Sequence, residues 1–463
     1  MIIRKHIAKA LALITLISSF SVGNTMEAKA ADYWPNSVGV TAESAIVMEQ
    51  ETGTILYSKN MDDEHFPASI TKIMTALIVL ENCDLDETVT FSADAVYGTE
   101  LGSSSIARDV NEEMTVEQTL YGMMLESANE CAYALGEHVA GDIPSFVKMM
   151  NDKAKELGCT HTHFNNTNGL PDDTHYTSAH DMALIARAAY SIPKFAEIVG
   201  TKNYSIPPTN KHPDPTPLNN HHQMLHYYKT NKYLYDYCLG GKTGYTVVAG
   251  ATLVTYAKKD GMTLICVVMK DSTTDQYYDT TNLFEYCFDN FSTVHVADFA
   301  SISEDNTDIT GILSENSELI QVDKNGLIVI PKTASVLDVT AEVVPYSDKD
   351  NKSVIGQLRY TYADRSVGYA NLLFTSAETG SYPFDNLPVE NGGSGKKYIQ
   401  VNYPKIALII LIIAAAFMLL LYIKSKSSEI LLFKHRYESR HTKPSKKGMI
   451  IIRDNGRKRR RRR

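Results

Sequence analysis

Apolar and polar positions alternate in two different ways along the chain and divide it into two folded regions. In the first, from about residue 44 to residue 290, strand-like runs lie at both ends and helical periodicity fills the middle. The expected strands are a hairpin over residues 44–57, a short strand at 88–91, and a second hairpin over 246–257 and 262–269. The expected helices begin at Ser69 and also cover about 116–125, 130–139, 143–157, 178–190 and 275–290. This order predicts an α+β fold, in which helices flank an antiparallel sheet.

The second region has shorter, β-branched apolar runs that are separated by turn residues. Five such runs predict a small all-β domain: 319–322, 326–330, 336–344, 356–363 and 367–374. We therefore assign residues 31–293 to the first domain and 294–374 to the second, all-β domain. Residues 375–404 contain Gly, Ser and Pro and are expected to form a linker that acts as a stalk.

Both ends of the chain carry apolar segments of a different kind. Residues 1–30 have a basic start, an apolar core and an Ala-Lys-Ala sequence at 28–30, which is typical of a secretory signal peptide. Residues 406–423 are uninterruptedly apolar and are bounded by Lys405 and Lys424. As a helix rising about 1.5 Å per residue, this segment would be roughly 27 Å long, close to the hydrocarbon thickness of a bilayer. We expect a transmembrane helix over residues 405–424.

Charge is divided unevenly along the chain and predicts the orientation of that helix. Residues 424–463 hold 16 Lys and Arg against 3 Asp and Glu, whereas residues 31–423 hold 25 against 50. Basic flanks stay in the cytoplasm, so the acidic body is expected outside the cell membrane and the tail, 425–463, inside as part of a single-pass protein. Anionic lipid is a sufficient partner for the basic tail, and no specific nucleic acid is expected.

The six cysteines all lie in the part expected to be exported. Their even number permits disulfides, but they are widely spaced, and Cys266 lies within an apolar run, so buried free thiols are equally consistent with the sequence. The absence of a Cys-x-x-Cys pair excludes a zinc ribbon or a thioredoxin-type site.

Residues 67–75 contain the first chemically suggestive motif, Ser69 followed by Lys72. On a helix these residues share a face, so the amine can take the proton of the hydroxyl and activate it as a nucleophile. A serine that merely caps the helix is the alternative. The spacing alone does not decide between them, because it recurs at Ser145, Ser191 and Ser394.

Two further motifs favour the interpretation of Ser69 as a nucleophile over that of a helix cap. Ser127-Ala-Asn129 lies between two expected helices, and Lys242-Thr243-Gly244 leads into an expected apolar strand. Ser-x-x-Lys, Ser-x-Asn and Lys-Thr-Gly in this order are typical of penicillin-binding proteins and class A β-lactamases.

With these motifs, the chain resembles the serine D-alanyl-D-alanine carboxypeptidase family of low-molecular-mass penicillin-binding proteins. The similarity covers about residues 44–290 and is carried by 67–75, 164–169, 175–177 and 242–250. It implies a transpeptidase/β-lactamase-like domain, followed by a β-sandwich that holds the site away from the membrane.

The resemblance also implies the roles of the catalytic side chains. Ser69 would be acylated by the D-Ala-D-Ala carbonyl, Lys72 would be the base, and Ser127 would relay protons. A free lysine titrates near 10.4, so Lys72 must be desolvated or lie near another cation to be neutral. Lys242 is expected to be that cation.

The remaining positions would bind the substrate. Asn129 would hold its amide, and Lys242 with Thr243 and Gly244 would hold its terminal carboxylate. The backbone N–H groups of the nucleophilic serine and Tyr245 would form the oxyanion hole.

The function implied is that of a membrane-anchored carboxypeptidase in cell-wall maturation. It would remove the terminal D-Ala from peptidoglycan stem pentapeptides through an acyl-enzyme and would be a target of β-lactams, with no metal or other cofactor. The Gly usual in the second motif is replaced here by Ala128, and Cys131 follows as either a reactive thiol or a packed small side chain.

Three alternatives remain open at this point. A class A β-lactamase would need a glutamate for deacylation, and none lies between Glu156 and Glu197. A zinc peptidase could use His161, His163 or the pair at 221–222, but His-Glu-x-x-His is absent. A non-catalytic envelope protein that senses penicillins would not need the complete set of acylating side chains.

Overall fold

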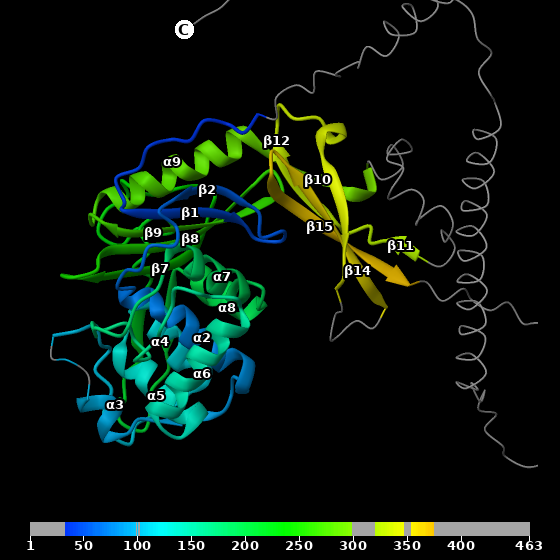
Figure 1. Cartoon of the computed structure of the whole chain (residues 1–463). Helices are drawn as coiled ribbons and strands as arrows, with labels where there is room; N and C mark the ends of the chain where they lie inside the picture. Colours follow the sequence, from blue (N-terminus) through cyan, green and yellow to red (C-terminus); the bar gives the residue numbers. More distant parts are fainter. Residues whose placement is uncertain (1–32, 99, 101, 299–319, 347–352, 375–463) are drawn as a thin grey trace, which may run out of the picture. The chain divides into compact units, whose positions relative to one another are not determined.

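The computed structural model describes residues 33–98, 100, 102–298, 320–346 and 353–374 (Figure 1). The chain divides into two compact units, 1–380 and 381–463, and all the described residues belong to the first. The predicted signal peptide, stalk, transmembrane helix and basic tail lie outside the described residues. None of the described helices combines the length and apolar character that crossing a bilayer requires.

A five-stranded antiparallel sheet forms the centre of the first domain, in the order β2-β1-β9-β8-β7. Its strands are β1 (Ser44–Glu49), β2 (Ile55–Lys59), β7 (Cys238–Thr246), β8 (Gly250–Lys259) and β9 (Met262–Asp271). The predicted hairpins are confirmed, except that β8 begins at Gly250 rather than at Thr246. Thr246 accepts a hydrogen bond from the Ala249 backbone N–H, and Gly250 has a φ of +67°, so these residues make the turn instead.

Successive side chains of this sheet point to opposite faces, and both faces are buried. In β8, for example, Val254 and Tyr256 pack with the helical cluster, whereas Leu253 and Ala257 pack with α9 (Asp275–Asn290) on the other side. Figure 1 shows α9 alone along one side of the sheet and the remaining helices on the other. The predicted α+β fold with a helix-flanked antiparallel sheet is confirmed.

The helical cluster contains all the predicted helices except α9, and two that the pattern did not indicate. Its members are α2 (Lys72–Asn82), α3 (Ala93–Tyr97), α4 (Val116–Leu125), α5 (Asn129–Ala140), α6 (Ile143–Glu156), α7 (Ala179–Tyr190) and α8 (Pro193–Gly200). The short α3 and α8 were missed, because neither spans enough turns to show a clear period. Helix α2 is buried on nearly all sides from Lys72 to Val79 and passes through the middle of the cluster.

Two small two-stranded sheets flank these helices and are tied together by a buried polar network. The first pairs β3 (Thr88–Thr90) with β4 (Glu113–Thr115), and the second pairs β5 (Asn203–Ile206) with β6 (Thr216–Asn219).

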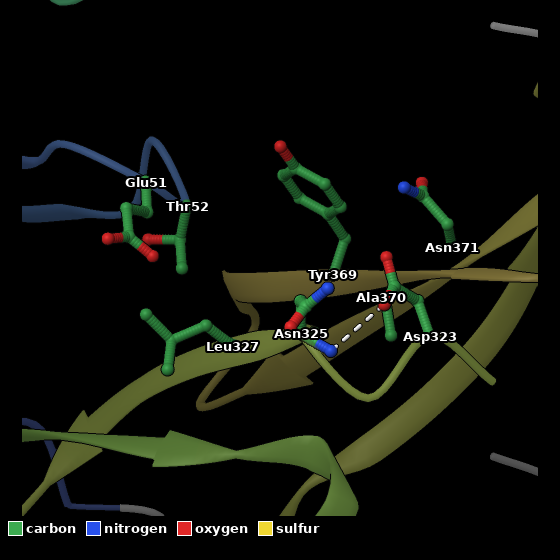
Figure 2. Close-up of a pocket in the computed structure, with 9 residues that line it drawn as sticks. Glu51, Thr52, Asp323, Asn325, Leu327, Tyr369, Ala370 and Asn371 are labelled. Atoms are coloured by element: carbon green, nitrogen blue, oxygen red, sulfur yellow. Dashed lines mark hydrogen bonds between the residues drawn. The ribbon is translucent and has the colours of Figure 1, made fainter. Parts of the chain in front are cut away.

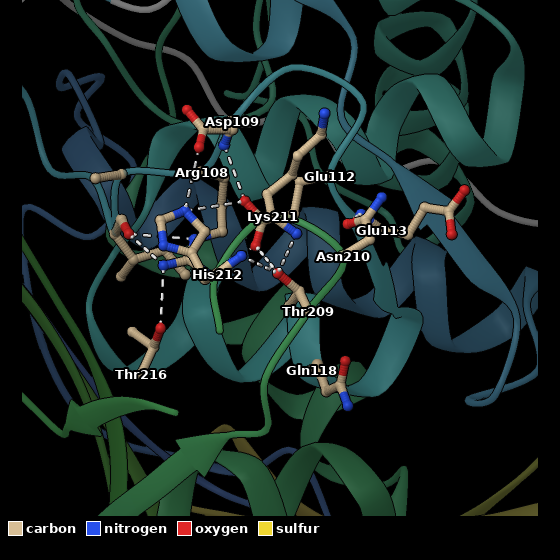
Figure 3. Close-up of polar contacts among 12 residues, drawn as sticks. Arg108, Asp109, Glu112, Glu113, Gln118, Thr209, Asn210, Lys211, His212 and Thr216 are labelled. Carbon is tan, nitrogen blue, oxygen red and sulfur yellow. Dashed lines mark hydrogen bonds and ion pairs between the residues drawn. The ribbon is translucent and has the colours of Figure 1, made fainter. Parts of the chain in front are cut away.

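The network is centred on Arg108 and Glu112, whose side chains form an ion pair of 2.9 Å with almost no solvent exposure (Figure 3). Thr209 donates to Glu112 at 2.7 Å, and Arg108 donates to Thr216 at 3.1 Å. These contacts fix the segment that precedes β4. In that segment, the Ser104 carbonyl accepts a hydrogen bond from the first backbone N–H of α5.

The second sheet is antiparallel and all-β, as predicted, in the order β10-β12-β15-β14-β13 with β11 beside β15. Its strands are β10 (Phe291–His295), β11 (Ile320–Val322), β12 (Leu327–Pro331), β13 (Thr340–Val344), β14 (Val354–Tyr362) and β15 (Arg365–Phe374). Residues 336–338, expected in a strand, form a 3₁₀ turn that is capped by Ser335. Figure 2 shows the turn between β11 and β12, where the Asn325 backbone N–H donates to the Asp323 carboxylate at 2.9 Å. The Asp323 backbone N–H donates to the Asn371 carbonyl of β15 at 2.8 Å.

Candidate active site

Ser69 lies on a 3₁₀ turn (Ala68–Thr71) that leads into α2, not on the α-helix itself. The residue at the N-cap of α2 is Thr71, and its side chain makes no capping hydrogen bond. The helix-cap alternative for Ser69 is therefore wrong. The turn is held from two sides, since Thr252 of β8 donates to the Pro67 carbonyl at 2.8 Å and Gly169 packs against the Ala68 carbonyl.

Ala68 has a left-handed backbone, with a φ of +51°. For a residue with a Cβ this conformation is strained by about 1 to 3 kcal/mol and persists only where surrounding contacts impose it. The strain is located immediately before Ser69, whose hydroxyl lies 3.2 Å from the Lys72 amine of α2.

The Lys72 amine is completely buried and faces three oxygen atoms. It lies 2.7 Å from the Asn129 side-chain oxygen, 2.7 Å from the Asn168 carbonyl and 3.2 Å from the Ser69 hydroxyl. The first two oxygens can only accept hydrogen bonds, so they take two N–H groups of the amine. In a neutral amine the remaining position is the lone pair, and it faces the Ser69 hydroxyl.

Burial and charge both favour the neutral form of Lys72. Desolvation is the larger cause that holds the pKa of Lys72 well below its usual range, and the Lys242 ammonium is the second. Glu130 acts in the opposite direction. The sequence-based expectation that Lys242 is the neighbouring cation agrees with this, although burial contributes more than any single residue.

Ser127 and Asn129 come from the junction of α4 and α5. Ser127 has a φ of +62°, which turns the chain sharply between the two helices, and Asn129 is the first residue of α5. The turn places Ser127 Oγ 3.2 Å from the Lys242 amine, while Asn129 reaches the Lys72 amine.

Lys242 lies within β7 rather than ahead of a strand, and it too is buried. Its amine donates to Ser127 Oγ and, at 3.0 Å, to the Thr243 carbonyl. Desolvation lowers the pKa of Lys242 to about 7, and Glu126 opposes this shift. At neutral pH the group is therefore close to equally charged and neutral.

The three residues after Lys242 carry β7 past Ser69. A Cβ at Gly244 would lie only 2.9 Å from the Ser69 backbone nitrogen and 2.4 Å from Thr252 Oγ1, so this close approach requires glycine. Thr243 is half-buried on the same strand. The Tyr245 side chain is 59% exposed, which leaves its backbone as the part nearest the site.

Two contributors to the site were not identified from the sequence. The Asn168 carbonyl is a backbone group and has no sequence signal. Glu130 is buried, where its carboxylate accepts hydrogen bonds from the Ser105 hydroxyl and the Ile106 backbone at 2.7 and 2.6 Å. It therefore braces the segment beside α5.

The structure also decides the cysteine alternatives. All six cysteines are free thiols. Cys131 is completely buried beside Gly122, and burial raises its pKa well above the usual range, which makes it a packed side chain and not a reactive one.

The histidines considered for a zinc peptidase are used in other contacts. His222 lies 3.0 Å from Thr255 Oγ1, and His221 lies 2.8 Å from Glu126.

A serine hydroxyl that faces a buried lysine amine, in an antiparallel sheet flanked by helices, is typical of serine acyl-transfer enzymes that use lysine as the base. Comparisons with known proteins specify the class further. A family model described as D-alanyl-D-alanine carboxypeptidase (Peptidase_S11) matches residues 28–273. The chain therefore belongs to this family of low-molecular-mass penicillin-binding proteins, and the predicted class of serine-type carboxypeptidase is confirmed.

Individual relatives agree with the family match. D-alanyl-D-alanine carboxypeptidase DacF of Bacillus subtilis is 36% identical over 258 residues, which are 54% of this chain and 63% of that protein. The match thus spans just under two thirds of that relative's length. DacA of Haemophilus influenzae is 28% identical over 381 residues, 78% of this chain and 91% of that protein.

Solved structures are similar in fold. The Streptomyces K15 DD-transpeptidase has a TM-score of 0.51 and 30% identity, with 55% of this chain and all of that chain covered. Penicillin-binding protein 5 from Haemophilus influenzae has a TM-score of 0.56 and 26% identity, with 73% and 98% covered.

Proposed function

We propose that the chain removes the terminal D-alanine from peptidoglycan stem pentapeptides through an acyl-enzyme on Ser69. The observation that carries the proposal is the Lys72 amine. Its two N–H groups donate to two acceptor oxygens. Its lone pair faces the Ser69 hydroxyl, and its nitrogen lies 3.2 Å from Ser69 Oγ. An amine so placed, with a lowered pKa, is a general base for that hydroxyl.

In acylation, Ser69 Oγ attacks the carbonyl carbon of the penultimate D-alanine while its proton passes to Lys72. The carbonyl oxygen becomes an oxyanion, stabilised by the backbone N–H groups of Ser69 and Tyr245. The close approach of Gly244 to the Ser69 nitrogen supports this pairing of the 3₁₀ turn, Ala68–Thr71, with β7.

Collapse of this intermediate breaks the peptide bond and needs a proton on the leaving nitrogen. Ser127 is suited to relay it, because its oxygen accepts a hydrogen bond from Lys242 and its own hydrogen can donate. As Ser127 gives up this hydrogen it takes the proton that Lys72 received from Ser69, so Lys72 is neutral again when D-alanine leaves. Terminal D-alanine leaves, and the rest of the peptide remains as an ester on Ser69. Water then attacks the ester while its proton passes to Lys72. Lys72 returns that proton to Ser69 Oγ as the ester bond breaks, which releases the peptide acid and restores the hydroxyl.

Substrate capture is assigned to the charged form of Lys242, with Thr243 beside it. The terminal carboxylate of the peptide is an anion that would stabilise the ammonium and shift its titration to higher pH. Asn129 would hold a substrate amide through the side-chain groups that Lys72 leaves available.

A direct test is release of D-alanine from diacyl-Lys-D-Ala-D-Ala by the full chain, with Ser69→Ala as the inactive comparison. The same two proteins are labelled with a fluorescent penicillin, since an acylating serine should react with β-lactams. We expect labelling and release by the wild type only. Equal labelling of Ser69→Ala would reject the nucleophile, and labelling without release would favour a penicillin sensor.

We further propose that the catalytic domain lies outside the cell membrane and acts in cell-wall maturation, anchored by residues 405–424. The support is the apolar segment and the basic residues after it. Protease added to intact cells should digest the domain and leave a tag on the tail intact. Digestion of the tail tag would reject this topology.

A further inference from the structure

Three side chains of metal-binding type meet at a place that the proposed reaction does not use. The Cys83 thiol, the Glu87 carboxylate and the His138 ring each offer one atom, and these atoms lie within 4.8 Å of one another. Glu87 Oε2 is already 2.9 Å from His138 Nε2. Cys83 and Glu87 lie in the connection between α2 and β3, and His138 comes from α5, so the fold brings the third side chain to the other two.

The ligand set matches zinc chemistry. Zinc binds thiolate, imidazole and carboxylate at about 2.0 to 2.3 Å, which places the ligand atoms of a tetrahedral site roughly 3.5 Å apart. The Glu87 side chain is 42% exposed and the His138 side chain 21%. Small rotations of these side chains can therefore bring the ligand atoms to the spacing of a tetrahedral site. A fourth position would be left for water.

The electrostatic surroundings also favour a cation. Cys83 is the C-cap of α2, and His138 lies in the last turn of α5, so the negative ends of two helix dipoles meet at this place. The charged groups that act on the thiol are Glu87 and Asp84, both anionic.

We propose that Cys83, Glu87 and His138 bind a zinc ion that clamps the C-terminal ends of α2 and α5. The opposite ends of these helices begin with Lys72 and Asn129, whose side chains are 2.7 Å apart in the candidate active site. Helix α2 has 11 residues and is therefore about 16 Å long, which separates the ion from the Lys72 amine. The ion is structural, and it fixes both helices at the end remote from the chemistry.

The test uses cobalt(II) as a spectroscopic probe on the untagged full chain in the reduced state. Wild type should bind one equivalent with a thiolate-to-cobalt charge-transfer band, and Cys83→Ser should lose that band. Cys159→Ser is the matched control, because it removes another half-buried thiol outside the cluster and should keep the band. His138→Gln should weaken cobalt binding at least about tenfold.

Thermal unfolding gives a second readout that does not depend on activity. Zinc should raise the unfolding midpoint of wild type and Cys159→Ser and leave that of Cys83→Ser unchanged. Penicillin labelling shows whether Cys83→Ser is folded. The proposal is overturned if wild type shows no thiolate band at one equivalent, if the band persists in Cys83→Ser, or if zinc shifts all three midpoints equally.

Discussion

Buried basic side chains have different kinds of partner in two regions of the same domain. In the network before β4, Arg108 is paired with the carboxylate of Glu112, and both side chains are buried. In the candidate active site, Lys72 and Lys242 are equally buried, but each bonds only to hydroxyl, amide or carbonyl oxygens among the described residues.

This difference separates buried charges that stabilise the fold from buried amines that can take part in proton transfer. A buried ion pair keeps both partners charged and fixes the backbone around it. A buried amine without a carboxylate partner has a lowered pKa and can gain or lose a proton near neutral pH. The first arrangement holds the site together, and the second gives the site groups that can transfer protons. The predictions below are ordered by their expected effect on acylation.

The largest loss is expected for Lys72→Arg. Arginine stays charged in proteins, so it cannot take the Ser69 proton even if it occupies the same space. We expect the rate of penicillin labelling to fall about 10³-fold, the scale of general-base catalysis. Lys148→Arg, on an exposed face of α6, is the control and should label normally. A loss of less than tenfold in Lys72→Arg would contradict the role of base.

Lys242→Gln should have the next largest effect, about 10²-fold in kcat/KM for the peptide. Glutamine cannot attract the substrate carboxylate. The substitution also removes the Lys242 charge, which lowers the pKa of Lys72. The pKa of Lys72 therefore rises, and the acid limb of the pH profile of acylation moves to higher pH. Unchanged acylation in Lys242→Gln would show that burial alone keeps Lys72 neutral.

The pH dependence of substrate capture tests the second lysine directly. With a pKa of about 7, Lys242 is charged below neutrality and neutral above it, so KM for the peptide should rise as pH increases through 7. Glu126→Gln removes a carboxylate that raises this pKa, and the increase in KM should begin at lower pH, by up to about one unit. Glu117→Gln, which loses a surface pairing with Lys194, should leave the profile in place. Identical profiles for all three proteins would contradict the assignment.

The smallest effect on acylation, with a large effect on stability, is expected in the Arg108 network. Arg108→Gln removes the guanidinium from the buried Glu112 carboxylate, whose other ion-pair partner among the described residues is His212 at 3.4 Å, and should lower the free energy of unfolding by about 3 to 5 kcal/mol. Arg108→Met with Glu112→Leu should be less harmful than the single change, because no charge is left buried.

Denaturant unfolding measures this loss, and penicillin titration normalises activity to folded protein. The folded fraction of each variant should acylate within about fivefold of wild type, since neither residue contacts the lysines. A specific loss of acylation in the double variant would show that the network contributes to chemistry.

The sequence predicted most of the fold because its helices and hairpins are long enough to show their periods. The α6 and α9 helices, for example, agree with prediction to within one residue. The elements that were missed, such as α8 and the turn that carries Ser69, are short and are determined by tertiary contacts.

The side chains proposed for the site could be found from the sequence because three motifs carry them. What could not be found are the groups that set their protonation, since these are backbone or burial effects. The Asn168 carbonyl contacts the Lys72 amine from 96 positions away, and any residue type would supply the same atom.

The contact between Gly169 and the Ala68 carbonyl joins two halves of the site that are far apart in sequence. A Cβ at position 169 would lie 1.8 Å from that oxygen, and Asn168, the preceding residue, holds the Lys72 amine. Any side chain there would displace both the turn that carries Ser69 and the Asn168 carbonyl that accepts a hydrogen bond from the Lys72 amine. Position 169 is therefore expected to stay glycine whatever residue stands at position 68, because the oxygen it would meet belongs to the backbone.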